Sequence, residues 1–227
     1  MTLSALASSA AKVTSASVVD KAALIVAGIV TTNVSFVCSA WLLFHLGVQT
    51  LRDEVLAMRA VEVYCMTAAS VFMSTVYTES PYAAFTFGGL LLLAKGCPNV
   101  AAASFAGAAA LRSNGILNCG FLVHDALVRS IRGQGKGRSS MLGLLLGTLL
   151  RCAVVLAPGA AFQAYAWSQE CQGASAPSWC HSRLPMVYTH VQATYWQGGF
   201  LRYYQWKQMP NFLLAAPTAC IAAAGVR

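Results

Sequence analysis

The residues best equipped for chemistry gather in the segment 188–217. Its first part mixes aromatic rings with His190, with arginine and lysine, and with glutamines that include Gln192, Gln205 and Gln208. Amide groups can bond sugar hydroxyls, and a histidine can move a proton. Aromatic rings among cations are also typical of a membrane–water boundary. The segment is therefore either a carbohydrate-binding wall or an interfacial belt that holds the apolar helix after it.

Two shorter polar motifs interrupt apolar sequence at residues 77–80 and 112–115. The planar guanidinium of Arg112 suits a phosphate, such as that of a lipid-phosphate donor. Glu79 would then orient Arg112 or a sugar hydroxyl. The structural alternatives are that Glu79 only pairs with a neighbouring cation and that Arg112 reaches to the membrane interface. His190 is likewise either an acid/base or a hydrogen-bonded structural residue.

The sequences of these three motifs resemble those of the GPI mannosyltransferase 2 family, the PIG-V-type enzymes of GPI-anchor assembly. That family carries the pattern Y-S-H-V-Q-x-x-Y-W-x-V-G-F-L-R-Y-x-x-x-x-Q-I-P-N-F-L-L-A, and residues 188–212 follow it with Thr189 for serine, Gly198 for valine and Met209 for isoleucine. We call residues 188–217 the signature segment. The motif at 77–80 is similar to L-Y-S-E-S. The family element R-S-N-G-L-x-N-x-G-F is matched by Arg112, Ser113, Asn114, Gly115, Asn118, Gly120 and Phe121.

This resemblance implies a GT-C-type glycosyltransferase in the membrane of the endoplasmic reticulum. It would add the second mannose to a GPI precursor on the luminal side, with dolichol-phosphate-mannose as the donor. We expect no cofactor and assign no metal ligands. The expected partners are the lipid-linked donor, the GPI-precursor acceptor, membrane lipids and a small membrane subunit. The residues that we assign to substrate binding are Glu79, Arg112, Asn114, His190, Gln192, Tyr195, Trp196, Arg202, Gln208 and Asn211.

The catalytic residue stays unassigned. Enzymes of this type need a carboxylate base for the acceptor hydroxyl. In the family this base is an aspartate that follows tryptophan in the first luminal loop, and no aspartate follows a tryptophan here. Glu79 and His190 are weak candidates for the role. We expect Met1 to follow the first membrane spans of the enzyme and Arg227 to precede the last ones.

Two functions of other classes compete with this one. A non-catalytic membrane scaffold or lipid-binding subunit of the same pathway would use the same luminal surface. A small transporter would account for the arginines Arg112 and Arg151 in apolar sequence. The transporter interpretation lacks the inverted repeats and paired broken helices that such proteins carry.

Composition indicates a membrane protein. Of the 227 residues, 57% are hydrophobic and only 10% are charged, and the mean hydropathy is +0.60. Soluble domains carry about 25% charged residues. The formal charge of +8 comes from cations scattered at the ends of apolar runs, which fits membrane topology and not nucleic-acid binding.

We expect one partial, all-helical transmembrane domain over residues 1–227, a polytopic bundle with short, partly embedded helices. Arg59 and Glu62 share a helix face and should pair. Residues 100–128 should form a helical hairpin or a sharply kinked helix around the break at 112–115. The expected spans and apolar helices are 22–46, 55–77, 81–94, 100–111, 116–128, 141–166 and 211–226.

The basic segment at about 129–139 should be cytosolic, because cytosolic loops carry an excess of Lys and Arg. Counting spans from there makes the polar loop at about 167–210 luminal and brings all three polar motifs to the luminal face. Cys171 and Cys180 are the cysteine pair in that oxidising loop, so we expect a disulfide between them, with two free thiols as the alternative.

Overall fold

The computed structural model describes residues 3–66, 70–133, 138–172, 176–182, 185–195 and 204–225. Within these ranges every regular element is a helix, as the sequence predicts, and none is a strand. The chain forms two compact units, residues 1–160 and 161–227. The expectation of one transmembrane domain stays a prediction.

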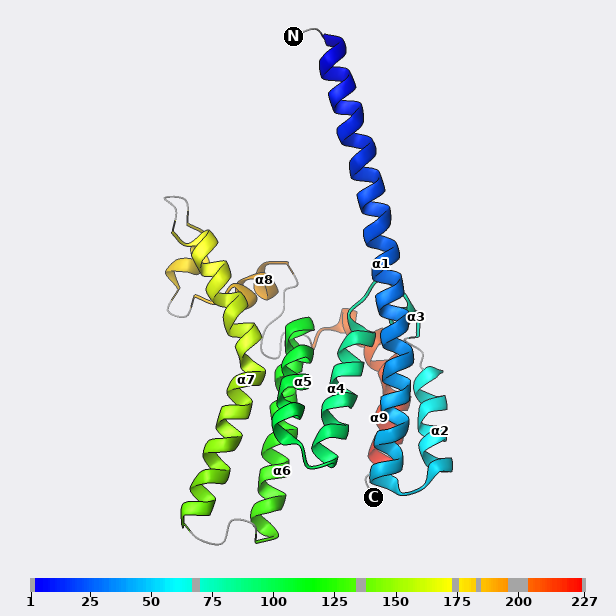
Figure 1. Ribbon diagram of the computed structural model, residues 1–227, viewed down its shortest axis with the longest axis vertical. Helices are drawn as coiled ribbons and strands as arrows, with labels where there is room; N and C mark the ends of the chain where they lie inside the picture. The colour runs from blue at the N-terminus through cyan, green and yellow to red at the C-terminus, as the bar shows by residue number, and fades with distance from the viewer. Residues whose placement is uncertain are drawn as a thin grey trace. The chain divides into compact units, whose positions relative to one another are not determined.

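Two helices are long and apolar enough to cross a membrane, among the described residues. Helix α1 (Leu3–Leu51) contains one such stretch at Asp20–Leu51, and α7 (Arg138–Glu170) contains the other at Ser140–Glu170 (Figure 1). Each exceeds the roughly 20 residues that a hydrocarbon core of about 30 Å requires. These two stretches cover the membrane spans expected at 22–46 and 141–166.

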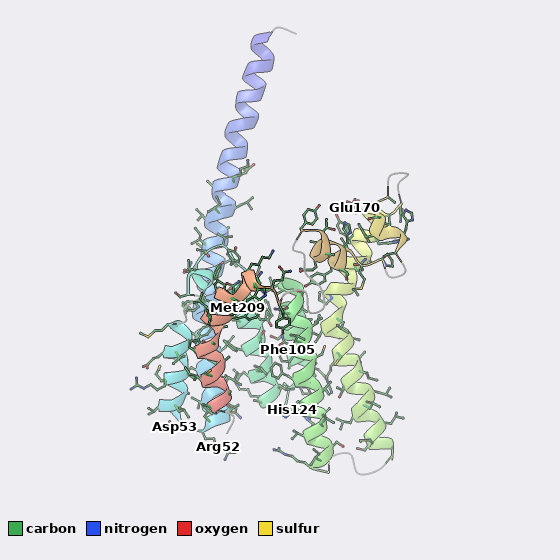
Figure 2. The ribbon with its side chains drawn as sticks, turned by 180° about the vertical axis from the view of Figure 1, so that it is seen from behind. Arg52, Asp53, Phe105, His124, Glu170 and Met209 are labelled. Atoms are coloured by element: carbon green, nitrogen blue, oxygen red, sulfur yellow. A yellow bond between two sulfur atoms is a disulfide. The ribbon has the colours of Figure 1, made fainter. Side chains whose placement is uncertain are left out.

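Helix α2 (Glu54–Cys65) turns back along α1 through Arg52 and Asp53, which Figure 2 labels. Arg52 has a positive φ of 56°, and Asp53 caps α2 by accepting a hydrogen bond from the Leu56 N–H at 3.0 Å. A Cβ added at Gly47 would lie 2.9 Å from Cβ of Ala57, so glycine permits the close approach of α1 and α2.

The continuous helix expected over 55–77 is wrong. Helix α2 ends at Cys65, α3 is only Ser70–Ser74, and residues 75–78 are bends. The Tyr64 hydroxyl bonds to Ser39 Oγ at 2.7 Å and contacts Met73 Sδ at 3.9 Å. These contacts, with Thr75 Oγ1 donating to the Val71 carbonyl at 2.7 Å, favour a broken backbone over a straight rod. The expected pair does form on α2, where Arg59 lies 2.7 Å from Glu62.

Helices α4 (Glu79–Ala94) and α5 (Pro98–Leu111) form an antiparallel pair. The ring of Phe105 lies where a side chain on Gly89 would be, 2.4 Å from an added Cβ. In the reverse direction, the ring of Phe85 lies 2.8 Å from a Cβ added at Gly107. Each helix thus receives an aromatic ring of the other over a glycine, which explains two of the small residues in this apolar sequence.

Of the two forms expected over residues 100–128, a hairpin or a sharply kinked helix, the structure shows the hairpin. A 3₁₀ turn, η1 (Ser113–Asn118), reverses the chain into α6 (Cys119–Ile131). The rings of Phe105 and Phe121 stack with centroids 6.2 Å apart across the hairpin. The buried cluster at its centre, which includes a residue of α7, consists of Ala101, Ala102, Phe105, Leu122 and Val155.

The second unit contains the end of α7 and four short elements. These are η2 (Ser178–His181), α8 (Val187–Tyr195), η3 (Trp206–Gln208) and α9 (Met209–Gly225). The sequence predicts only a polar loop where α8 lies, so this helix is a correction. The expected apolar helix at 211–226 begins earlier, at Met209, because Pro210 is tolerated in a first helical turn.

Candidate functional site

The first unit brings two of the predicted site residues into contact. Arg112 Nη1 forms an ion pair with Oε2 of Glu79, although the two residues belong to different helices. Glu79 lies in the first turn of α4, and Arg112 caps the end of α5. Their side chains are 27% and 33% exposed, so the pair is shielded but still reachable. The ends of two antiparallel helices thus place a carboxylate against a guanidinium.

Arg112 is oriented by the turn that follows it. Its backbone is extended, with φ −148° and ψ 140°, and its N–H bonds the carbonyl of Ala108 at 3.1 Å. The N–H of Gly115 returns to the Arg112 carbonyl at 2.9 Å. A Cβ added at Gly115 would lie 2.3 Å from the backbone of Ala109, so only glycine fits here. The Arg-Ser-Asn-Gly order therefore sets the position of the guanidinium.

Two buried polar side chains lie in the elements next to the pair, one in α4 and one in η1. Ser80, fully buried beside Glu79, donates from Oγ to the Met73 carbonyl at 2.6 Å. Asn118, 3% exposed at the end of η1, donates from Nδ2 to Thr86 Oγ1 at 3.4 Å. The sequence analysis includes Ser80 in the motif at 77–80 but assigns it no role in substrate binding or catalysis. A serine directly after the glutamate, at a helix start, is the signal that would have found it.

The Glu79 carboxylate is aimed at the guanidinium. Its Oε2 atom is buried and, within the described part of the chain, makes no hydrogen bond that would compete with the Arg112 charge. The N-terminal end of α4 also favours a negative group. Asn114, the third predicted residue here, is exposed on η1. This arrangement can present an arginine of fixed direction, with a polar amide nearby in sequence, to an anionic group.

The second unit holds the remaining predicted residues. His190 and Gln192 are half-buried on α8, and Tyr195 at its end is 74% exposed. Asn211 donates from Nδ2 to Gln208 Oε1 at 2.7 Å, so these two predicted residues pair across the start of α9. Trp196 and Arg202 lie outside the described residues. The site roles of these residues stay predictions.

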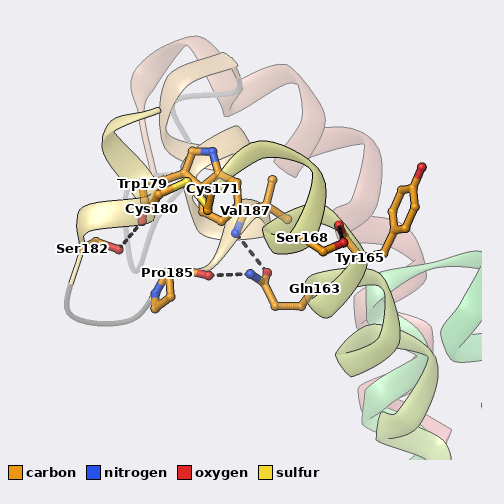
Figure 3. The surroundings of a disulfide bond; sticks show 9 residues. All are labelled: Gln163, Tyr165, Ser168, Cys171, Trp179, Cys180, Ser182, Pro185 and Val187. Carbon is orange, nitrogen blue, oxygen red and sulfur yellow. Dashed lines mark hydrogen bonds between the residues drawn. A yellow bond between two sulfur atoms is a disulfide. The ribbon is translucent and has the colours of Figure 1, made fainter. Parts of the chain in front are cut away.

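Two anchors hold the chain that leads into α8 (Figure 3). Cys171 and Cys180 are joined by a disulfide, in agreement with the pairing expected from sequence. Beyond it, the side-chain amide of Gln163 on α7 bonds the backbone at Pro185 and at Val187. Sequence reasoning missed Gln163, whose signal is a lone amide in an apolar helical stretch.

Comparison with known proteins shows the family to which this chain belongs. The family described as Mannosyltransferase (PIG-V) matches residues 3–226, which is nearly the whole chain. The chain belongs to the PIG-V mannosyltransferase family. It is 32% identical over 214 residues to the human GPI alpha-1,6-mannosyltransferase 2, and 34% identical over 211 residues to the GPI mannosyltransferase 2 of Gibberella zeae.

The similarity to PIG-V relatives is uneven in coverage. The aligned region takes in 83% of this chain but 43% of the human protein, and 85% of this chain but 49% of the Gibberella zeae protein. The chain thus spans less than half the length of these two relatives. No solved structure matches it.

Proposed function

We propose that this chain serves mannose transfer in GPI-anchor biosynthesis, as a multi-pass membrane protein of the endoplasmic reticulum. Its fold would be of the GT-C type, and the reaction would move the second mannose from dolichol-phosphate-mannose to the GPI precursor at the luminal face. The observation that carries the proposal is the Glu79–Arg112 pair, formed by two family motifs in a chain of the PIG-V family.

Arg112 is the group that would meet the donor phosphate. A guanidinium presents five N–H donors in one plane, and the contact with Glu79 involves Nη1. The N–H groups on the other nitrogens of the guanidinium would bond phosphate oxygens in the same plane. Glu79 serves this role by holding the plane of the guanidinium, which removes side-chain entropy that donor binding would otherwise cost.

The signature segment would bind the sugars. His190 and Gln192 on α8, and the linked pair Gln208 and Asn211, offer neutral hydrogen-bonding groups. The proposal needs no cofactor. A catalytic base is not assigned. Of the two candidates, Glu79 forms an ion pair with Arg112. This pairing suits a group that orients Arg112 better than a group that accepts a proton.

A scaffold or lipid-binding subunit of the same pathway is the second candidate function. It is favoured by the exposed rings of the second unit, where Tyr195, Tyr204 and Trp206 are 74%, 72% and 88% exposed. Aromatic side chains of this kind settle at the headgroup level of a bilayer. In either case the partners would be lipid-linked sugars and membrane lipids, with a small membrane subunit as a further candidate.

The test is complementation. The coding sequence that contains these residues is expressed in cells that lack GPI alpha-1,6-mannosyltransferase 2, and GPI-anchored proteins are counted at the surface by flow cytometry. We expect the wild type to restore them and Arg112→Lys to restore them far less at equal protein level. A wild type that reaches the endoplasmic reticulum but restores nothing would reject the enzyme and favour the scaffold.

A further inference from the structure

Helix α8 is too short to be stable by itself. It has nine residues, from Val187 to Tyr195. Isolated helices of fewer than about 12–15 residues are marginal in water, because the first turn fixes several dihedral angles for a single hydrogen bond. The first N–H groups of such a helix also have no partner within it. The direction of α8, and of His190 and Gln192 on it, must therefore be set by contacts from outside the helix.

The disulfide bridge lies before α8 in the chain. Cys180 lies in η2, so the bridge to Cys171 restrains the chain before the helix begins. The residues next to Cys180 restrain the same part of the chain. Trp179 is 6% exposed, and its carbonyl accepts a hydrogen bond from Ser182 Oγ at 2.7 Å (Figure 3). A restraint at residue 180 alone leaves the start of α8 undetermined.

Gln163 supplies the contact at the helix start. Its Oε1 atom accepts from the N–H of Val187, the first residue of α8, at 3.0 Å. Its Nε2 atom donates to the carbonyl of Pro185. Figure 3 shows both bonds running from one side chain to the two backbone sites. The amide thus satisfies an N–H that the helix itself cannot satisfy and fixes the carbonyl just before it.

Only a primary amide of this length makes both bonds. A glutamate of the same shape keeps the acceptor but places a second acceptor against the Pro185 carbonyl. A methionine of similar volume makes neither bond and leaves two backbone groups without that partner. The contact therefore depends on the chemistry of the side chain and not on its size alone.

We propose that Gln163 is the positioning residue of the signature segment: its amide fixes the first residue of α8 and thereby the orientation of His190 and Gln192. This rests on the proposed function, in which those two side chains bind sugar. Gln163 is not itself a catalytic residue. It would act on the reaction only through the helix that it holds.

The experiment measures α8 directly. Amide hydrogen exchange is followed by mass spectrometry over residues 187–195 in the full-length protein, purified in detergent. Gln163→Met should speed exchange of the first turn of α8 by about tenfold, which is the order expected for losing two hydrogen bonds. Gln169→Met is the matched control, because Gln169 is exposed in the last turns of the same helix. It should leave the exchange unchanged.

Mannose transfer is measured on the same variants in membranes. We expect Gln163→Met to reduce transfer at least several-fold and Gln169→Met to leave it unchanged. Normal exchange in Gln163→Met would overturn the proposal, and so would faster exchange with unchanged transfer. If Gln163→Met does not accumulate, Gln163→Glu replaces it with the same expectations. A wild type without transfer would count against the proposed function, while the exchange result would still support or refute the anchor.

Discussion

Arg112 Nη1 forms an ion pair with Oε2 of Glu79. Arg112 stands between α5 and η1, and Glu79 is the first residue of α4. Both come from motifs that are far apart in the sequence. Next to Glu79 in the chain, Ser80 bonds the Met73 carbonyl, and the N–H of Gly115 bonds the backbone carbonyl of Arg112. The pair is therefore a built feature of the α4–α5 packing, and it differs from the exposed pair of Arg59 with Glu62, whose side chains are 71% and 48% exposed.

Arg112→Lys should impair donor use more than folding. Lysine keeps the charge but loses the planar fork with which an arginine can bond two phosphate oxygens at once. We expect transfer to fall at least tenfold while the protein level and thermal stability stay near those of the wild type. The measurement is transfer from labelled dolichol-phosphate-mannose in membranes. Arg59→Lys, on the exposed pair, is the control and should change neither quantity, since exposed pairs contribute little. Equal transfer by both variants would return Arg112 to a structural role.

Gly115→Ala should destabilise the turn that orients Arg112. The added methyl would lie 2.3 Å from the Ala109 backbone, which cannot move without disturbing the end of α5. Overpacking of this kind costs about 1–3 kcal/mol of unfolding free energy. Thermal unfolding in detergent gives the readout. Gly120→Ala is the matched control, because a Cβ at Gly120 meets nothing within 4 Å. Similar melting temperatures for the two variants would contradict the close approach.

Loss of the disulfide should loosen the second unit. Cys171 and Cys180 are nine residues apart, and closing a loop of that length stabilises a fold by about 2–3 kcal/mol on the chain-entropy model. Cys171→Ser should therefore increase proteolysis of the second unit without increasing that of residues 1–160. Cys220→Ser, at an exposed free cysteine of α9, is the control. Alkylation of both Cys171 and Cys180 in the unreduced wild type would rule the bridge out.

Topology can be read with inserted glycosylation sequons. A sequon near Ser175 should be glycosylated, and one near Gly135 should not, because the basic segment at 129–139 is expected to stay in the cytosol. The readout is a mobility shift that a glycosidase reverses. The opposite pattern would place both the predicted substrate-binding residues and the disulfide on the wrong side of the membrane.

The sequence by itself determined the helical class, the two long apolar spans and the family motifs. It also predicted the Arg59–Glu62 pair and the cysteine pairing. These follow from local properties: apolar runs of membrane-spanning length, charges three residues apart on one helix face, and two cysteines in one polar loop. Even the hairpin over residues 100–128 was predictable, because Arg112-Ser113-Asn114-Gly115 breaks an apolar run at a glycine.

Tertiary contacts decided what local pattern could not. Helix α2 ends at Cys65 although the apolar sequence continues, since Tyr64 finds Ser39 and Met73 as partners from other elements. Helix α8 forms in a polar segment, where Gln163 accepts a hydrogen bond from the N–H of Val187, a group that has no partner within the helix. A helix of nine residues, or a break inside an apolar run, is settled by a few kcal/mol of packing and hydrogen bonding from distant residues. Periodicity and propensity carry no information about those partners, so only the folded chain could reveal them.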